Sequence, residues 1–338
     1  MINIGVVGTG IMGQIYGDIL ARDRSVNFCG VLGNTAEGCS KFAKDTGFQV
    51  SVGGFVGKFI EDNGLDAIVI ATPEEVRDSQ LHDAVDGGVA ILVEKPFATS
   101  VLQAVKNAQL LADYDAPVAV CNVLRFNPRF FELKRAVTNG MLGSIRHASS
   151  RRDSNTLRAQ RVAGKTRLEF WLSPHDVDVF HWLTGEKVTC ARAWSGAGGQ
   201  SANDYLLATL VSESGTKLSH QVSWCTEPLN SGHNNASFEV WGTNGYASAF
   251  DSPSGTFICT STNGASVPDT HEHFAISDLY RGMFETMLSS FIDRVETKDK
   301  QSNDLHLDAA LEVTIGCAMI GMSLDQNRTI YREEIVGP

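Results

Sequence analysis

The stretch INIGVVGTGIMG, residues 2–13, places three glycines after a short, mostly apolar run. Ile2–Val7 has the length and β-branched content of a buried strand, and the residues after Gly13 are compatible with a helix. Here Gly8 permits a tight turn, Gly10 lets a phosphate approach the backbone, and Gly13 lets the helix pack closely on the strand. The first N–H groups of the helix then bind the phosphates. The residues predicted to form this cofactor loop are Gly8, Thr9, Gly10, Ile11, Met12 and Gly13.

The rest of the N-terminal part repeats the alternation of strand and helix. Further strands are predicted at Val26–Leu32, Ala67–Ala71, Ala90–Val93 and Val118–Cys121, with helices such as Glu37–Thr46 and Val101–Ala112 between them. Strands separated by helices form a parallel sheet through right-handed crossovers. Residues 1–121 are therefore predicted to be an α/β domain with a doubly wound parallel sheet. In that context the glycine loop fits a dinucleotide better than it fits a purely structural turn.

Residues 122–338 have a different pattern, and a chain of 338 residues favours two domains because single cores stop growing at about 250–300 residues. Helices are predicted at Pro128–Asn139 and Pro174–Thr184. Strands are predicted at Lys187–Trp194, Asp204–Val211, Thr216–Trp224, Ser237–Trp241, Tyr246–Phe250 and Thr256–Thr260. The turns at residues 213–215 and 243–245 have hairpin length.

Two helices are predicted to close the chain. The first has apolar residues at helical spacing, namely Leu279, Met283, Met287, Phe291 and Val295, and the second covers about Asp304–Leu324. The second domain is therefore predicted to be α+β, with a large open, mainly antiparallel sheet.

Composition argues against several classes of partner. The net charge of −11 disfavours nucleic acid and anionic membranes. No stretch is expected to supply the ~20 apolar residues of a membrane span, and no basic region precedes the apolar N-terminal residues as in a signal peptide. Seven widely spaced cysteines without a C-x-x-C pair suit a reducing, cytoplasmic location.

The end of the second predicted strand bears on the type of dinucleotide. NAD sites usually carry an acidic residue there, which binds the ribose hydroxyls. This chain has Gly33, Asn34 and Thr35 instead. Without a carboxylate a 2′-phosphate is tolerated, and Asn34 and Thr35 can bond it, but no arginine is adjacent and Lys41 and Lys44 lie further along. We expect NAD or NADP, with NADP slightly favoured.

The stretch VEKPFATS, residues 93–100, ends the predicted strand Ala90–Val93 on a charged pair and a proline. Proline keeps the preceding residue out of the helical region, so Lys95 is expected to be extended at the strand exit. Open α/β sheets bind their ligands at such exits. Lys95 is therefore a candidate catalytic group, and the alternative is a solvated charge at a strand end.

Taken together, these pieces resemble the glucose–fructose oxidoreductase, inositol dehydrogenase and MocA-like (Gfo/Idh/MocA) family. The motifs that carry the resemblance are Gly8–Gly13, Ala71-Thr72-Pro73, Glu94-Lys95-Pro96, Arg125-Phe126-Asn127-Pro128 and His175-Asp176-Val177-Asp178. The resemblance implies a Rossmann domain, a sheet domain and hydride transfer between nicotinamide and a sugar, polyol or related carbonyl compound. By position it places Thr72 and Pro73 beside the nicotinamide ribose, Glu94 and Lys95 at the nicotinamide, and His175 at the acid/base position.

The chain departs from the family pattern at two positions. Many members carry an aspartate four residues before the histidine, where this chain has Trp171. Many also carry a histidine near the position of Arg77. The first departure implies an altered proton relay and a different substrate pocket.

The local sequence supports a chemical role for His175. Ser173-Pro174-His175-Asp176 is predicted to start a helix with Ser173 as its N-cap. In the first turn the helix dipole disfavours imidazolium, and a neutral imidazole can accept the proton that an alcohol loses. Asp178 lies three residues on, where it can bond the substrate or orient the ring. The alternative is a histidine bonded to nearby backbone.

Four residues are candidates for substrate contact: Arg125, Asn127, Arg152 and Trp171. Arg152 belongs to a basic cluster that also includes Arg151, Arg158, Arg161, Lys165 and Arg167. Such a cluster can bind an acidic substrate, although a solvated or subunit-contact loop is the favoured interpretation. His271-Glu272-His273 has no third ligand nearby in the sequence, so no metal site is expected.

The sequence thus predicts a cytoplasmic NAD(P)-dependent oxidoreductase with a small-molecule substrate. The alternatives are a nicotinamide-binding sensor without turnover and a redox-neutral enzyme that retains NAD(P). An open antiparallel sheet often buries one face against a partner, so a homodimer or homotetramer through the C-terminal sheet is expected.

Overall fold

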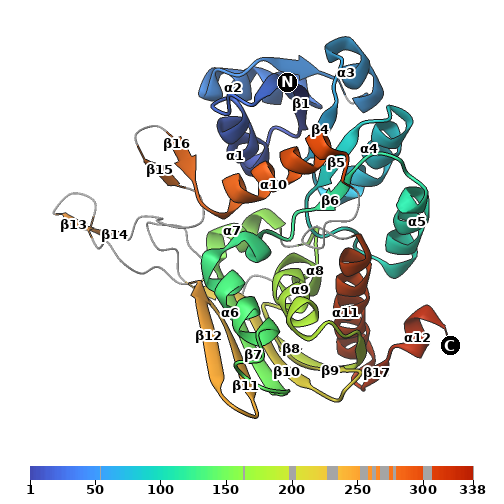
Figure 1. The fold of residues 1–338 in the computed structure, drawn as a ribbon, viewed down its shortest axis with the longest axis vertical. Coiled ribbons are helices and arrows are strands. Elements are labelled where there is room, and N and C mark those ends of the chain that lie inside the picture. The colour runs from blue at the N-terminus through green and yellow to red at the C-terminus, as the bar shows by residue number, and fades with distance from the viewer. Residues whose placement is uncertain are drawn as a thin grey trace. The chain divides into compact units, whose positions relative to one another are not determined.

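A six-stranded parallel sheet forms the N-terminal part of the computed structural model, with strand order β3-β2-β1-β4-β5-β6 (Figure 1). Its strands are β1 (Ile2–Val7), β2 (Val26–Gly33), β3 (Val50–Val52), β4 (Ala67–Ile70), β5 (Ala90–Val93) and β6 (Val118–Val120). The helices between them are α1 (Ile11–Leu20), α2 (Ala36–Thr46), α3 (Val56–Asn63), α4 (Glu74–Asp86) and α5 (Val101–Ala112). This order is that of the doubly wound dinucleotide-binding fold, so the predicted fold class is confirmed.

The structure describes residues 1–53, 55–162, 164–197, 203–226, 235–251, 258–260, 264–266, 274–276, 279–299 and 307–337. The histidines at 271 and 273, weighed above as metal ligands, lie outside these ranges. Among the described residues no group of three or more His, Cys, Asp or Glu is placed to hold a metal ion.

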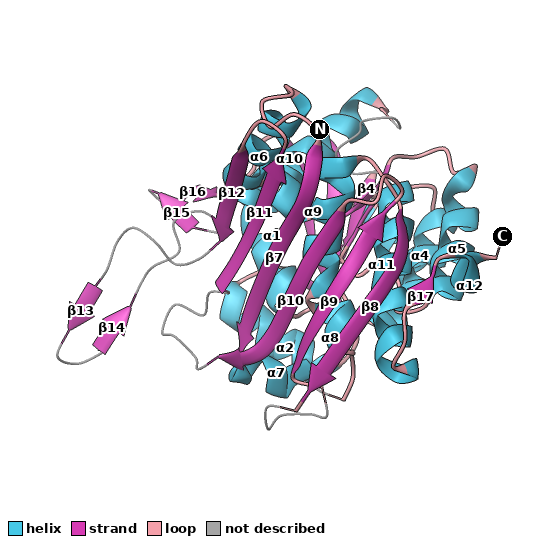
Figure 2. Cartoon of the chain, turned by 90° about the horizontal axis from the view of Figure 1, so that it is seen from below, coloured by secondary structure: helices cyan, strands magenta, loops and turns pink. Residues whose placement is uncertain are grey.

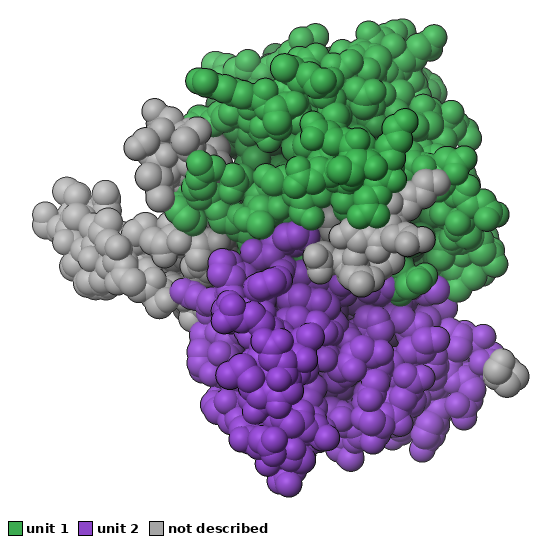
Figure 3. All heavy atoms as spheres, viewed as in Figure 1, with its two compact units in different colours: residues 1–98, 102–123, 271–308 green, residues 99–101, 124–270, 309–338 purple. Residues whose placement is uncertain are grey.

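The chain divides into two compact units (Figure 3). Unit 1 comprises residues 1–98, 102–123 and 271–308, and unit 2 comprises residues 99–101, 124–270 and 309–338. Unit 1 therefore includes α10 (Met283–Thr297), which lies in the sequence region expected to form the second domain. The ring of Phe284 on α10 meets that of Tyr16 on α1 edge-on, with centroids 6.1 Å apart.

The start of α10 corrects one expectation. The apolar spacing predicted a helix that already contains Leu279, but Leu279 lies in β16 (Leu279–Arg281), and the helix begins after Gly282. Gly282 has a φ of 112°, a conformation that a helix residue cannot adopt. Apolar spacing alone gave no sign of this break. β16 pairs with β15 (Phe274–Ile276), and a second short pair consists of β13 (Ile258–Thr260) and β14 (Gly264–Ser266).

Unit 2 is built on a seven-stranded sheet with the order β12-β11-β7-β10-β9-β8-β17 (Figure 2). Its strands are β7 (Ile145–Asn155), β8 (Val188–Gly196), β9 (Tyr205–Ser212), β10 (Lys217–Thr226), β11 (Asn235–Gly242), β12 (Tyr246–Asp251) and β17 (Ile330–Tyr331). The predicted hairpins join β9 to β10 and β11 to β12. The sheet is mainly antiparallel, as predicted, but β7 runs parallel to β10 at its centre.

The helices of unit 2 lie on one face of this sheet, as Figure 2 shows. They are α6 (Pro128–Thr138), α7 (Thr156–Val162), α8 (Leu168–Trp171), α9 (Ser173–Thr184) and α11 (Leu307–Gln326), preceded by the 3₁₀ turn Val123–Phe126; α12 (Glu333–Val336) follows β17. On α11, Cys317, Met319 and Ile320 have no exposed surface.

Helix α11 corrects a second expectation. It is the one helix of the described chain that is long and apolar enough to cross a membrane, although no such stretch was expected. However, 61% of its most apolar 18-residue stretch is buried inside the fold, as is usual for a core helix.

Candidate active site

The glycine loop between β1 and α1 has the geometry of a phosphate site. A Cβ at Gly13 would lie 1.9 Å from the carbonyl oxygen of Gly8, and Gly8 itself has a φ of +124°. Gly10 differs, because a Cβ there would meet no atom within 4 Å. Gly10 caps α1 in an extended conformation, without a side-chain bond to the first-turn N–H groups. The backbone N–H groups of the first turn and the open space at Gly10 therefore fit a pyrophosphate.

The strand end that was expected to select the cofactor is closely packed. A Cβ on Gly33 would lie 2.4 Å from Cys39 Sγ and 2.7 Å from Thr9 Cγ2, so this position admits no aspartate without rearrangement. Asn34 next to it is exposed. The hydroxyl of Thr35 accepts from the Gly38 N–H at 3.2 Å and caps α2, which gives this side chain a structural task.

Thr72 and Pro73 lie between the end of β4 and the start of α4. Pro73 is the N-cap of α4. The Thr72 hydroxyl donates to Gln80 Oε1 at 2.5 Å, which ties the strand exit to the helix that follows.

Arg77, one turn into α4, fixes the backbone on both sides of Lys95. Its Nη1 donates to the carbonyl oxygens of Glu94 at 2.8 Å and Pro96 at 2.5 Å. Its Nη2 donates to the Thr72 carbonyl oxygen at 2.6 Å. One buried guanidinium thus connects the exits of β4 and β5. The Lys95–Pro96 peptide bond between these contacts is cis.

The Glu94 side chain also forms hydrogen bonds next to Lys95. Its Oε2 accepts from the Lys95 backbone N–H at 3.0 Å, and its Oε1 accepts from the Tyr16 hydroxyl at 2.5 Å. Tyr16 also contacts Cys121 Sγ at 3.3 Å. Burial raises the pKa of Tyr16 and that of Cys121, so both stay protonated. Glu94 is only 6% exposed, whereas Lys95 is half-buried.

His175 lies in the first turn of α9, half-buried. The predicted cap is wrong in detail. The N-cap is Leu172, which is also the C-cap of α8, and it makes no side-chain cap bond. Because α8 runs almost directly into α9, Ser173 is already helical, and its hydroxyl contacts His220 Nε2 at 2.9 Å. Sequence alone gave no sign of the short preceding helix.

His220 on β10 connects the sheet to the start of α9. Its Nδ1 lies 2.7 Å from the Ser150 hydroxyl on β7, while its Nε2 meets Ser173. Burial lowers the pKa of His220 to about 4, since an imidazolium would lose its hydration there. Asp176 raises that pKa and Arg152 lowers it, and neither outweighs the burial.

Both acidic residues of α9 form buried ion pairs. Asp178 accepts from Arg125 Nε at 2.9 Å and from its Nη2 at 2.6 Å. Asp176 accepts from Arg152 Nε at 2.9 Å and from its Nη2 at 3.0 Å. All four side chains are at most 3% exposed. In this conformation they hold α9 in place and present His175.

The two other candidates for substrate contact differ from one another. Asn127 has no exposed surface, and its Oδ1 accepts from the Arg129 N–H as the N-cap of α6. Trp171, at the end of α8, is half-buried. Of the four candidates, only Trp171 keeps a partly exposed side chain.

The basic cluster is dispersed. Successive residues of β7 face opposite sides of the sheet, so Arg151 is exposed while Arg152 is buried. Arg167 forms ion pairs with Glu169 and with Asp325, the latter at 2.9 Å. Arg151 also pairs with Asp153, at 3.4 Å, so at least three of the six basic side chains have acidic partners within the fold.

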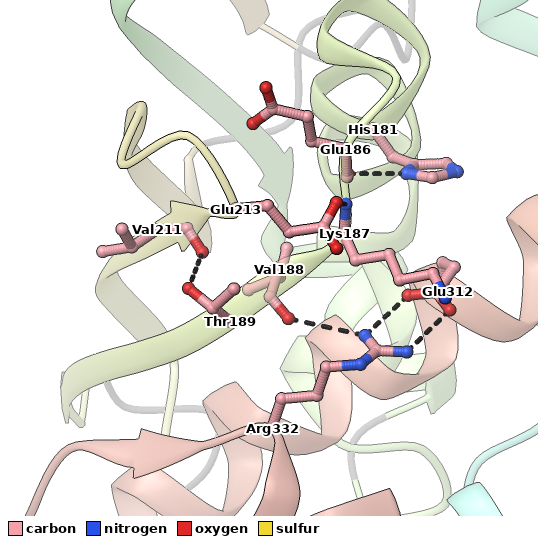
Figure 4. Close-up of polar contacts among 9 residues, drawn as sticks. All are labelled: His181, Glu186, Lys187, Val188, Thr189, Val211, Glu213, Glu312 and Arg332. Carbon is pink, nitrogen blue, oxygen red and sulfur yellow. Dashed lines mark hydrogen bonds and ion pairs between the residues drawn. The ribbon is translucent and has the colours of Figure 1, made fainter.

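His181, further along α9, has a structural partner. Its Nδ1 lies 2.8 Å from the Glu186 carbonyl oxygen just after the helix (Figure 4). In the same region Arg332 binds both carboxylate oxygens of Glu312, at 2.6 and 2.7 Å, and ties the C-terminal residues to α11. Because His181 bonds backbone at the end of α9, it serves as a control for His175 in the first turn of the same helix.

Two family models match the chain. The model described as oxidoreductase family, NAD-binding Rossmann fold, matches residues 2–121, and the GFO/IDH/MocA C-terminal domain model matches residues 130–248. This chain belongs to the Gfo/Idh/MocA family of oxidoreductases. The predicted family is therefore confirmed.

Relatives within the Gfo/Idh/MocA family are distant. The chain is 27% identical over 191 residues to the rhizopine catabolism protein MocA of Rhizobium meliloti, covering 55% of this chain and 58% of that protein. It is 28% identical over 200 residues to inositol 2-dehydrogenase 2 of Saccharopolyspora erythraea, covering 56% of each. The matched part thus spans about half the length of these curated relatives.

A solved structure shares the fold over nearly the whole chain. The structure of scyllo-inositol dehydrogenase from Lactobacillus casei with bound NAD(H) and scyllo-inositol superposes with a TM-score of 0.80 at 17% identity. The superposition covers 98% of this chain and 99% of that one.

Several residues that form the hydrogen-bond networks around Lys95 and His175 were not predicted from the sequence. Arg77 was noted only as a departure from the Gfo/Idh/MocA pattern, and Tyr16, Cys121 and His220 were not singled out. One signal was available for Arg77: it precedes Leu81 and Ala84 at helical spacing, on the face of α4 that is buried. A charge in such a place needs partners.

Proposed function

We propose that this chain is an NAD(P)-dependent oxidoreductase that acts on a CH–OH group of a polyol, sugar or sugar-derived carbonyl compound. The observation that carries the proposal is the open N-terminus of α1 at Gly10, where backbone N–H groups and free space fit a dinucleotide phosphate. The names of the curated relatives, inositol 2-dehydrogenase and rhizopine catabolism protein, support an inositol-like substrate.

The chemistry follows from what each side chain can do. A bound nicotinamide supplies the hydride acceptor or donor. Lys95 donates a hydrogen bond to the substrate oxygen and stabilises negative charge on it as the C–H bond breaks. His175, in the first turn of α9, accepts the hydroxyl proton in its neutral form and returns it in the reverse reaction.

The remaining candidates act on these two groups. Asp178 stays with Arg125 as a positioning pair, and Glu94 fixes the Lys95 backbone through its own carboxylate. Trp171 forms part of the wall that a substrate ring meets. This proposal keeps the expected site residues but gives the arginines positioning roles in place of substrate contact.

For the cofactor we propose that NADP binds at least as tightly as NAD. Support comes from Gly33, where packing against Cys39 and Thr9 excludes the carboxylate that would repel a 2′-phosphate. The exposed Asn34 beside it can donate to phosphate oxygens.

The test of this function is a turnover panel with inositols, hexoses and sugar acids, with NAD and NADP each supplied as cofactor. Wild type is compared with His175→Ala and with the control His181→Ala, whose ring bonds the Glu186 carbonyl oxygen just after the helix (Figure 4). We expect turnover with at least one polyol, a loss of about 10²–10⁴-fold in His175→Ala, and near-normal turnover in the control. Bound cofactor without turnover of any substrate would instead indicate a sensor.

For the quaternary state we propose a homo-oligomer through the outer face of the C-terminal sheet. No element of the described ranges covers that face in Figure 2. It carries Trp194, Leu207 and Phe250, each about half exposed, around an open hollow that also contains Arg151 and Glu239. Apolar side chains with both signs of charge suit a self-complementary contact.

The quaternary proposal is tested by light scattering. Leu207→Glu is expected to yield monomers, whereas Leu157→Glu, an equally exposed leucine on α7, is expected to leave the assembly intact. A wild type that is monomeric at micromolar concentration would contradict it. The expected cytoplasmic location stays a prediction.

A further inference from the structure

Arg77 occupies a position on α4 where an apolar residue would be expected. The buried residues of this helix are Arg77, Leu81 and Ala84, a single stripe against the sheet. Arg77 is 6% exposed, and burial lowers its pKa. A guanidinium still keeps its proton in proteins, so a full charge lies inside the unit and must be compensated by acceptors.

The acceptors are three backbone carbonyl oxygens, those of Thr72, Glu94 and Pro96. The negative charges of Glu74 and Glu94 also raise the pKa of Arg77, although burial outweighs them. Two of the carbonyl oxygens flank Lys95 directly, and both take their hydrogen bond from the same Nη1. The rigid planar fork of arginine suits this geometry, whereas the single ammonium of lysine does not reproduce it.

These contacts have a direct geometric consequence. With the carbonyls of the residues before and after Lys95 held by one group, the backbone rotations of this segment are restricted, and so is the direction in which the Lys95 Cα–Cβ bond leaves the chain. The Thr72 contact ties this segment to the exit of β4, at the residues proposed to lie beside the nicotinamide ribose.

We propose that Arg77 is a positioning residue of the reaction, which holds Lys95 in its productive orientation relative to the β4 exit. The inference rests on the proposed function of Lys95. It differs from a purely structural role because it requires that loss of the Arg77 fork act on turnover through Lys95, while cofactor binding at the glycine loop is retained.

The first arm of the test does not depend on any activity. Hydrogen exchange of the peptide that contains residues 93–98 is measured in wild type, in Arg77→Lys and in Arg294→Lys. Arg294 is a matched control, a second buried arginine of unit 1, on α10, that bonds the Asp299 carbonyl oxygen. We expect exchange of the Lys95 amide to rise at least about tenfold in Arg77→Lys and to stay unchanged in the control. Equal exchange in all three proteins would overturn the proposal.

The second arm measures single turnover and cofactor affinity. We expect Arg77→Lys to reduce the turnover rate by about 10–100-fold, the usual effect of a misplaced catalytic group, with cofactor affinity within about threefold of wild type. In the Lys95→Met background the Arg77→Lys change should have no further effect beyond about threefold, because both changes remove one function. Multiplicative losses, or an equal loss of cofactor affinity, would overturn the proposal.

Failures of the two claims are distinguishable. A wild type that turns over no substrate of the panel contradicts the proposed function, while the exchange arm still decides whether Arg77 holds the segment. A wild type that turns over beside an equally active Arg77→Lys contradicts the inference alone. Thermal melts accompany each variant, and Arg77→Gln replaces Arg77→Lys if the lysine variant does not fold.

Discussion

The residues proposed for the site differ in kind between the two units. In unit 1 the proposed site depends on backbone: a Cβ at Gly10, the N-cap of α1, would meet no atom within 4 Å, and the carbonyl oxygens of Glu94 and Pro96 accept from Arg77. In unit 2 the polar residues around His175 are side chains already bound to one another, as in the pair of Arg125 with Asp178.

Because of this difference, the sequence predicts the backbone site more reliably than the roles of the charged side chains. A backbone site requires glycines and prolines at fixed spacing, so a sequence motif reports it directly. A charged side chain in a sequence does not reveal whether it meets a substrate or a partner inside the fold. The arginines expected to contact substrate are bound by two acidic residues of α9, Asp178 and Asp176.

The largest effect is expected at the glycine loop. Gly13→Ala places a Cβ 1.9 Å from the Gly8 carbonyl oxygen, so the loop must shift and cofactor binding should be lost. Gly10→Ala adds the same methyl group to open space and should fold normally, with cofactor affinity reduced only through crowding of the phosphate. Fluorescence titration and a thermal melt of both variants provide the measurement. Full cofactor binding by Gly13→Ala would contradict the description of this loop.

The second largest effect is expected when a buried ion pair of unit 2 is broken. Asp178→Asn leaves the Arg125 charge buried without its counter-charge, so the free energy of unfolding should fall by about 3–5 kcal/mol. Asp325→Asn removes a partner of Arg167 in an exposed pair and should change it by less than about 1 kcal/mol. Urea unfolding compares the two. A small effect of Asp178→Asn would mean that α9 does not depend on this pair.

A smaller effect concerns pH. Because burial holds the pKa of His220 at about 4, below the usual 6.5, the folded unit binds fewer protons than the unfolded chain between these values. The stabilisation is therefore complete above pH 6.5 and is lost as the pH falls from 6.5 toward 4. Between pH 7 and 5 the loss should be about 2 kcal/mol.

The variant His220→Gln removes the pH-dependent stabilisation that comes from the buried neutral histidine. The drop in unfolding free energy between pH 7 and 5 should be smaller in the variant than in wild type by about the same 2 kcal/mol. Parallel pH profiles of the two proteins would show that His220 is not a buried neutral histidine.

The smallest effect is expected for cofactor choice. Gly33→Asp is unsuitable because its Cβ would meet Cys39 and Thr9, but Asn34→Asp adds a carboxylate at an exposed position. It should shift the ratio of NADP to NAD affinity toward NAD by about tenfold, or 1.4 kcal/mol. Competitive titration measures the ratio, and a wild type that already prefers NAD tenfold or more contradicts the proposed preference.

Two strands show how much of the fold the sequence could predict. β5 was predicted with its bounds, since Ala90–Val93 is an unbroken apolar run in a buried parallel sheet. β7 was missed, although it lies at the centre of the larger sheet. Its inward residues are Ala148, Ser150, Arg152 and Ser154, which form no apolar period. Only their partners in the fold, such as Asp176 and His220, make these residues suited to the interior.

The same reason limits prediction of the site. Lys95 could be singled out because proline and the strand end constrain it locally, whereas Arg77 and His220 act through contacts with residues distant in the chain. The predicted cap at Ser173 failed because α9 already includes this residue, whose hydroxyl contacts His220, distant in the chain.

Single-turnover hydride transfer by Lys95→Met tests the central claim most directly. Methionine keeps much of the bulk but removes the donor, and Lys41→Met on the exposed face of α2 is the matched control. We predict a fall of about 10²–10³-fold in Lys95→Met, with cofactor affinity and melting temperature close to wild type, and no change in the control. A folded Lys95→Met that transfers hydride at the wild-type rate would mean that Lys95 is only a charge at a strand end, in contradiction of this account.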